Sequence, residues 1–148
     1  MQCSILKSVL AVLSLSAVLL AGCAQSPAKP QASLYDRLGG KEAITAVVDA
    51  LSANVAADGR INQRFANANI KRFKAQMVDL LCEASGSPCK YKGMDMQTVH
   101  AGMKISEAEF MAVAESAAKT LDSFKVPAAE KAEVMNLLAS MKGDIVNR

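Results

Sequence analysis

Apolar residues recur every three or four positions in four separate stretches of this chain, which is the spacing of one face of an α-helix. No stretch of useful length alternates apolar and polar residues in the way that a strand does. We therefore predict an all-α fold whose amphipathic helices bury their apolar faces against one another. The four stripes are Ile44, Val47, Val48, Leu51 and Val55; Ile70, Phe73, Met77, Leu80 and Leu81; Phe110, Val113, Ala114, Ala117, Leu121 and Phe124; and Val134, Leu137, Leu138, Met141 and Ile145.

Residues that favour helix ends lie between the stripes and predict where each helix starts and stops. Glycine and proline end helices, whereas a capping box or an early proline begins them. The predicted stops are Gly39-Gly40 after a short helix at 34–38, Asp58-Gly59 after the second helix, and Gly86-Ser87-Pro88 after a long helix that follows Asn69. The predicted starts are a capping box of Ser106 and Glu109, and Pro127 as the first residue of the last helix.

A further short helix is predicted at 94–103, and it carries the single histidine of the chain, His100. Met96 and Met103 fall on or near the same face as this histidine. A lone histidine among apolar residues is either a core residue that hydrogen-bonds a neighbour or a ligand, and spacing alone leaves both interpretations open. The count of one histidine does exclude HExxH zinc proteases and metal sites built from several histidines.

Composition limits the kind of protein further. The chain has 148 residues, of which 51% are apolar and only 4% aromatic, so its core consists mainly of aliphatic side chains, Ala and Met. A charged fraction of 21% fits one folded domain and argues against disorder. The net charge of +3 is too weak to predict a nucleic-acid partner.

Residues 1–22 have the organisation of a secretory signal peptide. Lys7 supplies positive charge ahead of an apolar run from Ser8 to Leu20, which is shorter than the ~20 residues that span a bilayer. The run ends in Leu20-Ala21-Gly22-Cys23, which resembles the bacterial lipobox. This resemblance implies cleavage before Cys23 and lipidation of that cysteine; an ordinary cleavable signal that a cysteine follows by chance is the alternative.

The lipobox resemblance implies a membrane-anchored lipoprotein. Acyl chains on Cys23 hold such a protein firmly on a bilayer. Ala24, rather than Asp, follows the cysteine, and this resembles the sorting pattern for the outer membrane, facing the periplasm. Residues 23–32 contain Pro27 and Pro30 among small and polar residues, so we expect a flexible tether there and a folded domain at 33–148.

The remaining cysteines predict a disulfide. Cys3 leaves with the signal peptide and Cys23 takes the lipid, so Cys82 and Cys89 are the two that stay in an oxidising compartment. Their spacing does not suit zinc, because no second pair of ligands is present to complete four. A disulfide between Cys82 and Cys89 is the favoured interpretation, and two free thiols are the alternative.

From residue 33 onward the chain resembles the group 1 truncated haemoglobins in three segments. Residues 34–44, LYDRLGGKEAI, resemble the short first helix and glycine corner of that family. Residues 57–65, ADGRINQRF, resemble the turn that leads to its haem-packing phenylalanine, here Phe65. Residues 91–100, YKGMDMQTVH, resemble the run into its proximal histidine, and this segment is the most specific because it fixes the only histidine.

The resemblance implies a truncated globin fold, in which a helical sandwich surrounds a haem. The haem is expected to be non-covalent haem b, since no CxxCH motif is present. A neutral imidazole is a usual axial ligand of haem iron. The implied haem-binding residues are His100 as the proximal iron ligand, Met96, Val99 and Phe110 on the proximal side, Phe65 against the haem face or edge, and Tyr91 either near a propionate or as an anchor of its loop.

The distal side departs from the family pattern. The family has a tyrosine on the second helix, supported by Gln or His on the long helix, to hydrogen-bond bound oxygen. Ser52 takes the tyrosine position here, and Phe73, Gln76 and Met77 face it from the long helix. Only Gln76 among them carries N–H groups, so we expect a pocket that holds oxygen poorly, at a cost of about 1.5–3 kcal/mol. Met77 as a sixth ligand of the iron is an alternative.

These expectations define a function and its alternatives. We expect a haem protein that reversibly binds a diatomic gas, namely oxygen, nitric oxide or carbon monoxide, at the periplasmic face of a bacterial membrane. One alternative is an enzyme, either a nitric oxide dioxygenase, which needs an unidentified reductant, or a weak peroxidase, which needs a distal base. A more remote alternative is a helical lipoprotein that has lost haem.

Overall fold

The computed structural model describes residues 31–148, and all regular structure in this part of the chain is helical apart from one isolated bridge. The signal peptide at 1–22, the lipidation site Cys23 and most of the tether lie outside the described residues. No helix within 31–148 has the length and apolarity needed to cross a membrane. The elements are α1 (Leu34–Arg37), α2 (Gly40–Ala57), the 3-10 turn η1 (Asn62–Phe65), α3 (Ile70–Ala84), α4 (Met96–His100), α5 (Glu107–Ser123), α6 (Ala128–Ser140) and α7 (Lys142–Ile145).

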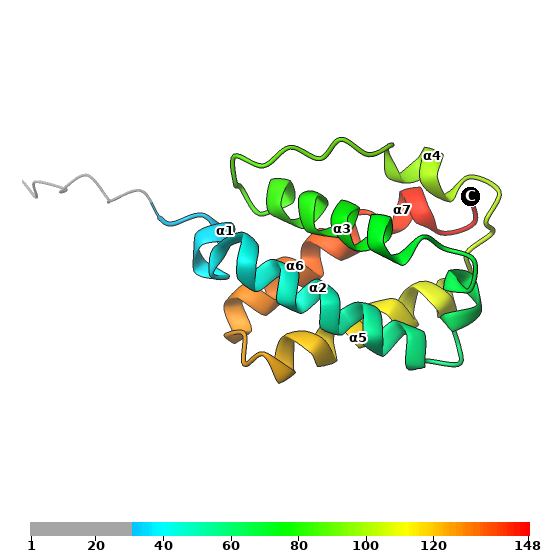
Figure 1. The fold of residues 1–148 in the computed structure, drawn as a ribbon, viewed down its shortest axis with the longest axis horizontal. Helices are drawn as coiled ribbons and strands as arrows, with labels where there is room; N and C mark the ends of the chain where they lie inside the picture. The colour runs from blue at the N-terminus through cyan, green and yellow to red at the C-terminus, as the bar shows by residue number, and fades with distance from the viewer. Residues whose placement is uncertain (1–30) are drawn as a thin grey trace, which may run out of the picture. The chain divides into compact units, whose positions relative to one another are not determined.

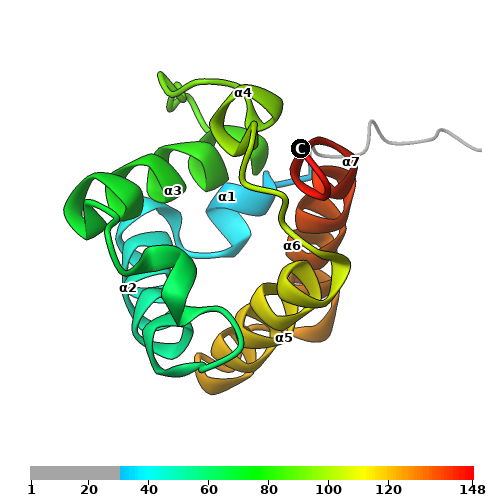
Figure 2. The same ribbon diagram turned by 90° about the vertical axis from the view of Figure 1, so that its right-hand side faces the viewer.

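The long helices form two packed pairs, α2 with α3 and α5 with α6, as Figures 1 and 2 show. Helix α2 packs against both α3 and α5, and α5 packs against α6. One core cluster, which includes Leu51, Val55 and Ala117, joins α2 to α5. A second cluster, which includes Ile44 and Val78, joins α2 to α3. The all-α prediction is confirmed, and the stripe of α2 supplies both clusters. In α3 the buried residues are Val78 and Cys82, which the predicted stripe did not include.

Most of the predicted helix ends are confirmed. Gly39 and Gly40 have φ values of +93° and +75°, a left-handed conformation that glycine adopts without steric cost. The side chain of Asn69 caps α3 by accepting a hydrogen bond of 2.9 Å from the backbone N–H of Arg72. The capping box is present in full, because Glu109 N donates to Ser106 Oγ and the Glu109 carboxylate accepts from Ser106 N.

Several details of the helix predictions are wrong. Pro127 is the N-cap of α6 rather than its first residue, with an extended ψ of 151°. Phe124 lies beyond the end of α5 and is 43% exposed, so it does not extend the apolar stripe into the core. Ile70 is 41% exposed because it begins α3, where no other helix covers it. The helix around His100 spans only 96–100, because Ala101 turns to an extended ψ of 128°.

The segment that follows α4 is bonded both to η1 and to the C-terminal residues. Arg64 of η1 donates to the carbonyl of Met103 at 2.9 Å and forms an ion pair of 2.6 Å with Glu109 at the start of α5. The backbone N–H of Lys104 donates to the carbonyl of Arg148, and residues 105 and 146 form an isolated parallel bridge. Helix α4 also contacts α7. The C-terminal end of the chain thereby fixes the position of α4, which is too short to be stable alone.

Removal of the α5 cap should destabilise the fold. We expect Ser106→Ala to lower the free energy of unfolding by about 1 kcal/mol, because the N-terminal N–H groups of α5 lose their acceptor. Equilibrium unfolding in urea measures this change. Ser140→Ala is the control, since the Ser140 hydroxyl only donates to the carbonyl of Leu137 within its own helix. An equal loss of stability in both variants would contradict a specific role for the cap.

Candidate functional site

The imidazole of His100 is held in one orientation by its own helix. Its Nδ1 lies 2.8 Å from the carbonyl oxygen of Met96, one turn earlier in α4. A carbonyl only accepts hydrogen bonds, so Nδ1 carries the proton and Nε2 keeps its lone pair. This is the tautomer of a metal-ligating histidine whose second nitrogen is oriented by a hydrogen-bond acceptor.

The start of α4 is fixed by the side chain of Asp95. Its Oδ1 accepts a hydrogen bond of 2.9 Å from Thr98 N, and its Oδ2 accepts one of 2.7 Å from the Thr98 hydroxyl. These hydrogen bonds lower the pKa of Asp95, since they favour the ionised carboxylate. The cap therefore stabilises the single helical turn that positions His100.

Aromatic and thioether side chains from η1 and α3 lie close to the core. The rings of Phe65 and Phe73 meet edge to face, with centroids 5.3 Å apart and planes at 67°. Phe65 and Met77 both pack against the core cluster between α2 and α5. The structure thus brings together three of the residues that the sequence assigned to the site, and they present an apolar surface.

Gln76, Tyr91 and Gly93 meet where α3 approaches the loop at 85–95. Gln76 Oε1 is buried and has no hydrogen-bond partner among the described residues. A Cβ atom on Gly93 would lie 2.3 Å from Gln76 Oε1 and 2.2 Å from the Tyr91 hydroxyl, which is closer than real contacts allow. Glycine at position 93 therefore permits the close approach. The unpaired Oε1 of Gln76 therefore lies beside Gly93 and Tyr91, where it can accept a hydrogen bond from a bound donor.

The hydroxyl of Ser52 is committed to its own helix. Its Oγ donates a hydrogen bond of 2.7 Å to the carbonyl of Val48. A serine hydroxyl has one proton, so in this rotamer none is left to donate to a molecule bound nearby. The donor-poor pocket stays a prediction, and the unpaired atom of Gln76 is its carbonyl oxygen Oε1, which only accepts hydrogen bonds.

The remaining predicted residues differ in how far they are enclosed. Phe110 on α5 is only 6% exposed, whereas Val99 on α4 is 37% exposed. Met96 is half-buried on α4. Tyr91 is half-buried, donates its hydroxyl to the carbonyl of Met94 at 2.9 Å, and has a pKa raised by burial. This hydrogen bond supports the role of Tyr91 as an anchor of its loop.

Two residues of the site were missed in the sequence. Gly93 stands inside the segment that leads to His100, and a glycine between larger residues is a signal of close backbone approach. Arg64 precedes Phe65, but no sequence pattern predicts that its guanidinium reaches Met103 and Glu109, since those contacts exist only in the folded chain.

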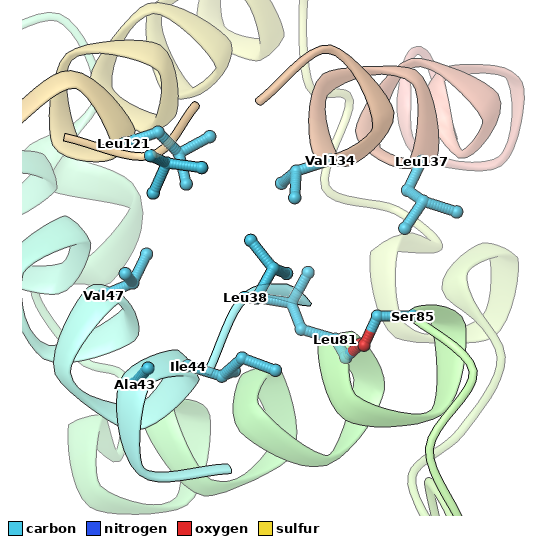
Figure 3. A pocket seen from close by; sticks show the side chains of 10 residues that line it. Leu38, Ala43, Ile44, Val47, Leu81, Ser85, Leu121, Val134 and Leu137 are labelled. Atoms are coloured by element: carbon cyan, nitrogen blue, oxygen red, sulfur yellow. The ribbon is translucent and has the colours of Figure 1, made fainter. Parts of the chain in front are cut away.

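A separate apolar cavity of about 40 Å³ lies between the α1–α2 corner, the end of α3, α5 and α6 (Figure 3). Its single polar side chain is Ser85, whose hydroxyl donates to the carbonyls of Leu81 and Cys82 rather than into the cavity. Space of this size exceeds that of one water molecule and suits small apolar molecules. The lining residues are Leu38, Ala43, Ile44, Val47, Leu81, Ser85, Leu121, Val126, Val134 and Leu137.

Comparison with known proteins explains this arrangement. Residues 33–147 match the family model described as Bacterial-like globin. This chain belongs to the bacterial-like globin family. The globin is 34% identical over 114 residues to the group 1 truncated hemoglobin of Mycolicibacterium paratuberculosis. The match covers 77% of this chain and 84% of that relative. It is 32% identical over 120 residues to that of Tetrahymena pyriformis, covering 81% and 98%.

A solved structure supports the same assignment. The crystal structure of the truncated hemoglobin from Tetrahymena pyriformis in its Fe(III) form has a TM-score of 0.76 to this globin at 30% identity, covering 79% of this chain and all of that one. A 2/2 hemoglobin from Synechococcus is among the structural neighbours, and its name refers to the two-on-two arrangement of helices. The predicted truncated globin fold is confirmed.

Globins of this family bind haem, in most members without a covalent bond, and the residues of this chain fit such a group. The Met96 carbonyl engages His100 Nδ1, which leaves Nε2 as the nitrogen for the iron; Phe65 and Phe73 form an aromatic pair; and Gln76 Oε1 is a buried polar atom without a partner among the described residues. Haem supplies an iron that binds diatomic gases. The chain supplies the imidazole, the apolar walls and the exclusion of water.

Loss of His100 should abolish normal haem retention. We expect His100→Ala to lose the ferric, ferrous and carbon monoxide absorption spectra of the wild-type globin, because no other histidine is present to ligate iron. Gln97→Ala is the control, since Gln97 is exposed on the same short helix. An unchanged set of spectra in His100→Ala would show that the assignment is wrong.

A methyl group at Gly93 should disturb the site. We expect Gly93→Ala to lower the free energy of unfolding by about 1–3 kcal/mol and to weaken haem binding, because Tyr91 or Gln76 must move. Urea unfolding of the haem-free protein and haem titration measure the two effects. Gly143→Ala provides the comparison, since a Cβ there has no neighbour within 4 Å. Equal stability of the two variants would contradict the steric argument.

Proposed function

We propose that this globin is a haem b lipoprotein that reversibly binds a diatomic gas at the periplasmic face of the outer membrane, through a distal pocket that lacks a strong hydrogen-bond donor. Family membership establishes haem-based gas binding; the choice of ligand and the location are the proposal. The observation that carries it is that the Ser52 hydroxyl donates its only proton to the Val48 carbonyl.

The missing donor affects the gases differently. An oxygen ligand accumulates negative charge and gains from an N–H or O–H donor, whereas carbon monoxide and nitric oxide depend on one much less. A hydrogen bond to a charged acceptor contributes about 1.5–3 kcal/mol, so its absence weakens oxygen affinity by about ten- to a hundred-fold. We propose carbon monoxide and nitric oxide as the ligands that this pocket favours relative to oxygen.

The enzymatic alternatives receive less support from the site. Turnover of nitric oxide with oxygen requires tightly held oxygen and a reductant, and turnover of peroxide requires a distal acid or base. Ser52, Phe73 and Met77 supply neither an acid nor a base, and the single histidine is the proposed proximal ligand. Gas binding is therefore the function that we propose, with nitric oxide dioxygenation as the second candidate.

Restoring a distal phenol should slow oxygen release. We expect Ser52→Tyr to lower the oxygen dissociation rate about ten-fold or more, because the phenol donates to the ligand. Stopped-flow measurement of the ferrous protein gives this rate. Ser52→Ala is the matched control and should release oxygen as the wild type does, since the Ser52 proton is already used within α2.

A second distal variant decides whether the pocket truly lacks a donor. We expect Gln76→Leu to change the oxygen dissociation rate little. If the wild type instead releases oxygen slowly and Gln76→Leu releases it fast, Gln76 is the donor, and the dioxygenase function gains support. A ferrous spectrum typical of two axial ligands would identify Met77 as a sixth ligand and would contradict an open gas site.

The lipid anchor is tested separately. We expect Cys23→Ser to leave the membrane fraction or to keep its signal peptide, because the acylated residue is lost. Cys3→Ser is the matched control, since Cys3 belongs to the segment that is removed. Fractionation and mass analysis of the mature N-terminus provide the measurement. A wild-type protein found only in the soluble periplasm, with an N-terminus other than Cys23, would contradict the anchor.

A further inference from the structure

Two thiols meet at the junction between α3 and the loop that leads to His100. Cys82 lies in the last turn of α3 and is completely buried, and Cys89 lies in the loop and is half-buried. Cys89 packs on the core cluster that contains Cys82. Both are free thiols in the structure, and the disulfide expected from the sequence stays a prediction.

The surroundings make the two thiols unequal. A hydrogen bond with Ser87, helped by the positive charge of Lys41, lowers the pKa of Cys89. Burial raises the pKa of Cys82 to about 11. Lys41 from α2 and Asp79 from α3 are the charged groups that face the pair, and they are joined by an ion pair of 3.2 Å. Cys89 is therefore both the more accessible and the more ionised thiol.

The loop has few other attachments to α3. Beyond the C-cap hydrogen bonds of Ser85 and Gly86, its backbone is held to the end of α3 by two hydrogen bonds, from Tyr91 N to the Glu83 carboxylate at 3.0 Å and from Ser87 N to the Cys82 carbonyl at 3.2 Å. Lys90 adds an exposed ion pair of 3.4 Å with Glu83. Exposed ion pairs contribute little to stability. A covalent bond at Cys89 would consequently be the strongest link between α3 and the segment that carries the iron ligand.

We propose that Cys82 and Cys89 form a thiol–disulfide exchange site, and that its disulfide fastens the loop at 85–95 to α3 and so slows the loss of haem. The reactant is a disulfide, carried either by an oxidoreductase or by a small thiol such as glutathione. The proposal rests on haem ligation by His100, but the exchange chemistry itself does not.

The exchange has two balanced steps. The Cys89 thiolate attacks one sulfur of the external disulfide, a mixed disulfide forms, and the first external thiolate leaves. Cys82 then gives up its proton to solvent, and its thiolate attacks Cys89 Sγ, so that the second external thiolate leaves. One disulfide forms in this globin and one is reduced to two thiols outside it. Cys82 acts second because no external molecule reaches a completely buried sulfur.

Single-cysteine variants test the order of attack. The reduced mature domain is treated with glutathione disulfide at neutral pH and analysed by mass. We expect the wild type to lose two hydrogens, Cys82→Ser to accumulate a glutathione adduct on Cys89, and Cys89→Ser to stay unmodified while it is folded. Equal reactivity of the two variants, or a wild type that forms only mixed disulfides, would overturn the exchange site.

The effect on the loop is measured with and without haem. We expect the oxidised wild type to transfer ferric haem to excess apomyoglobin several-fold more slowly than the reduced wild type, and the Cys82→Ser/Cys89→Ser double variant to match the reduced protein under both conditions. Hydrogen exchange at residues 86–95 of the haem-free protein should slow on oxidation in the wild type alone. Identical haem loss and identical exchange in both redox states would overturn the fastening of the loop, whatever the fate of the thiols.

Discussion

The hydrogen bond from His100 Nδ1 to the Met96 carbonyl determines which imidazole nitrogen is left without a proton, and the surrounding structure holds the short helix in which that bond forms. A helix of five residues does not form by itself, because the cost of nucleation exceeds the gain from its single turn. Asp95 therefore caps its start, and the C-terminal segment pairs with the residues that follow it. The long helices form the packed body of the domain, whereas the short helix α4 carries the histidine.

Polar groups on the distal side are handled in two different ways. The hydroxyl of Ser52 is satisfied within α2 and so is removed from the pocket. The Oε1 atom of Gln76 is buried without a partner among the described residues, an arrangement that is costly unless a bound donor uses it. The two side chains thus differ, because the Ser52 proton is used within α2 whereas the Gln76 carbonyl oxygen keeps unused capacity to accept a hydrogen bond.

Most helix positions were accessible from the sequence because they depend on local pattern. The spacing of Ile44 to Val55 predicted α2, whereas the iron-ligand role of His100, which rests on the run that ends in Val99-His100, stays a prediction. Phe124 and Ile70 were assigned wrongly because periodicity gives the face of a helix but not whether another element covers its end. The contacts of Arg64 were inaccessible, since they join segments that are distant in the chain.

The ion pair between Arg64 and Glu109 determines how one attachment in the fold responds to acidic pH. Hydrogen bonds from Arg64 and from Ser106 lower the pKa of Glu109 to about 2, compared with about 4.5 for an unperturbed glutamate. A carboxylate with a depressed pKa contributes stability above its ordinary value, and that contribution is lost only as the pH falls through the depressed one. The ion pair therefore persists through mildly acidic conditions, and so does the link that Arg64 makes between the start of α5 and the Met103 carbonyl beyond α4.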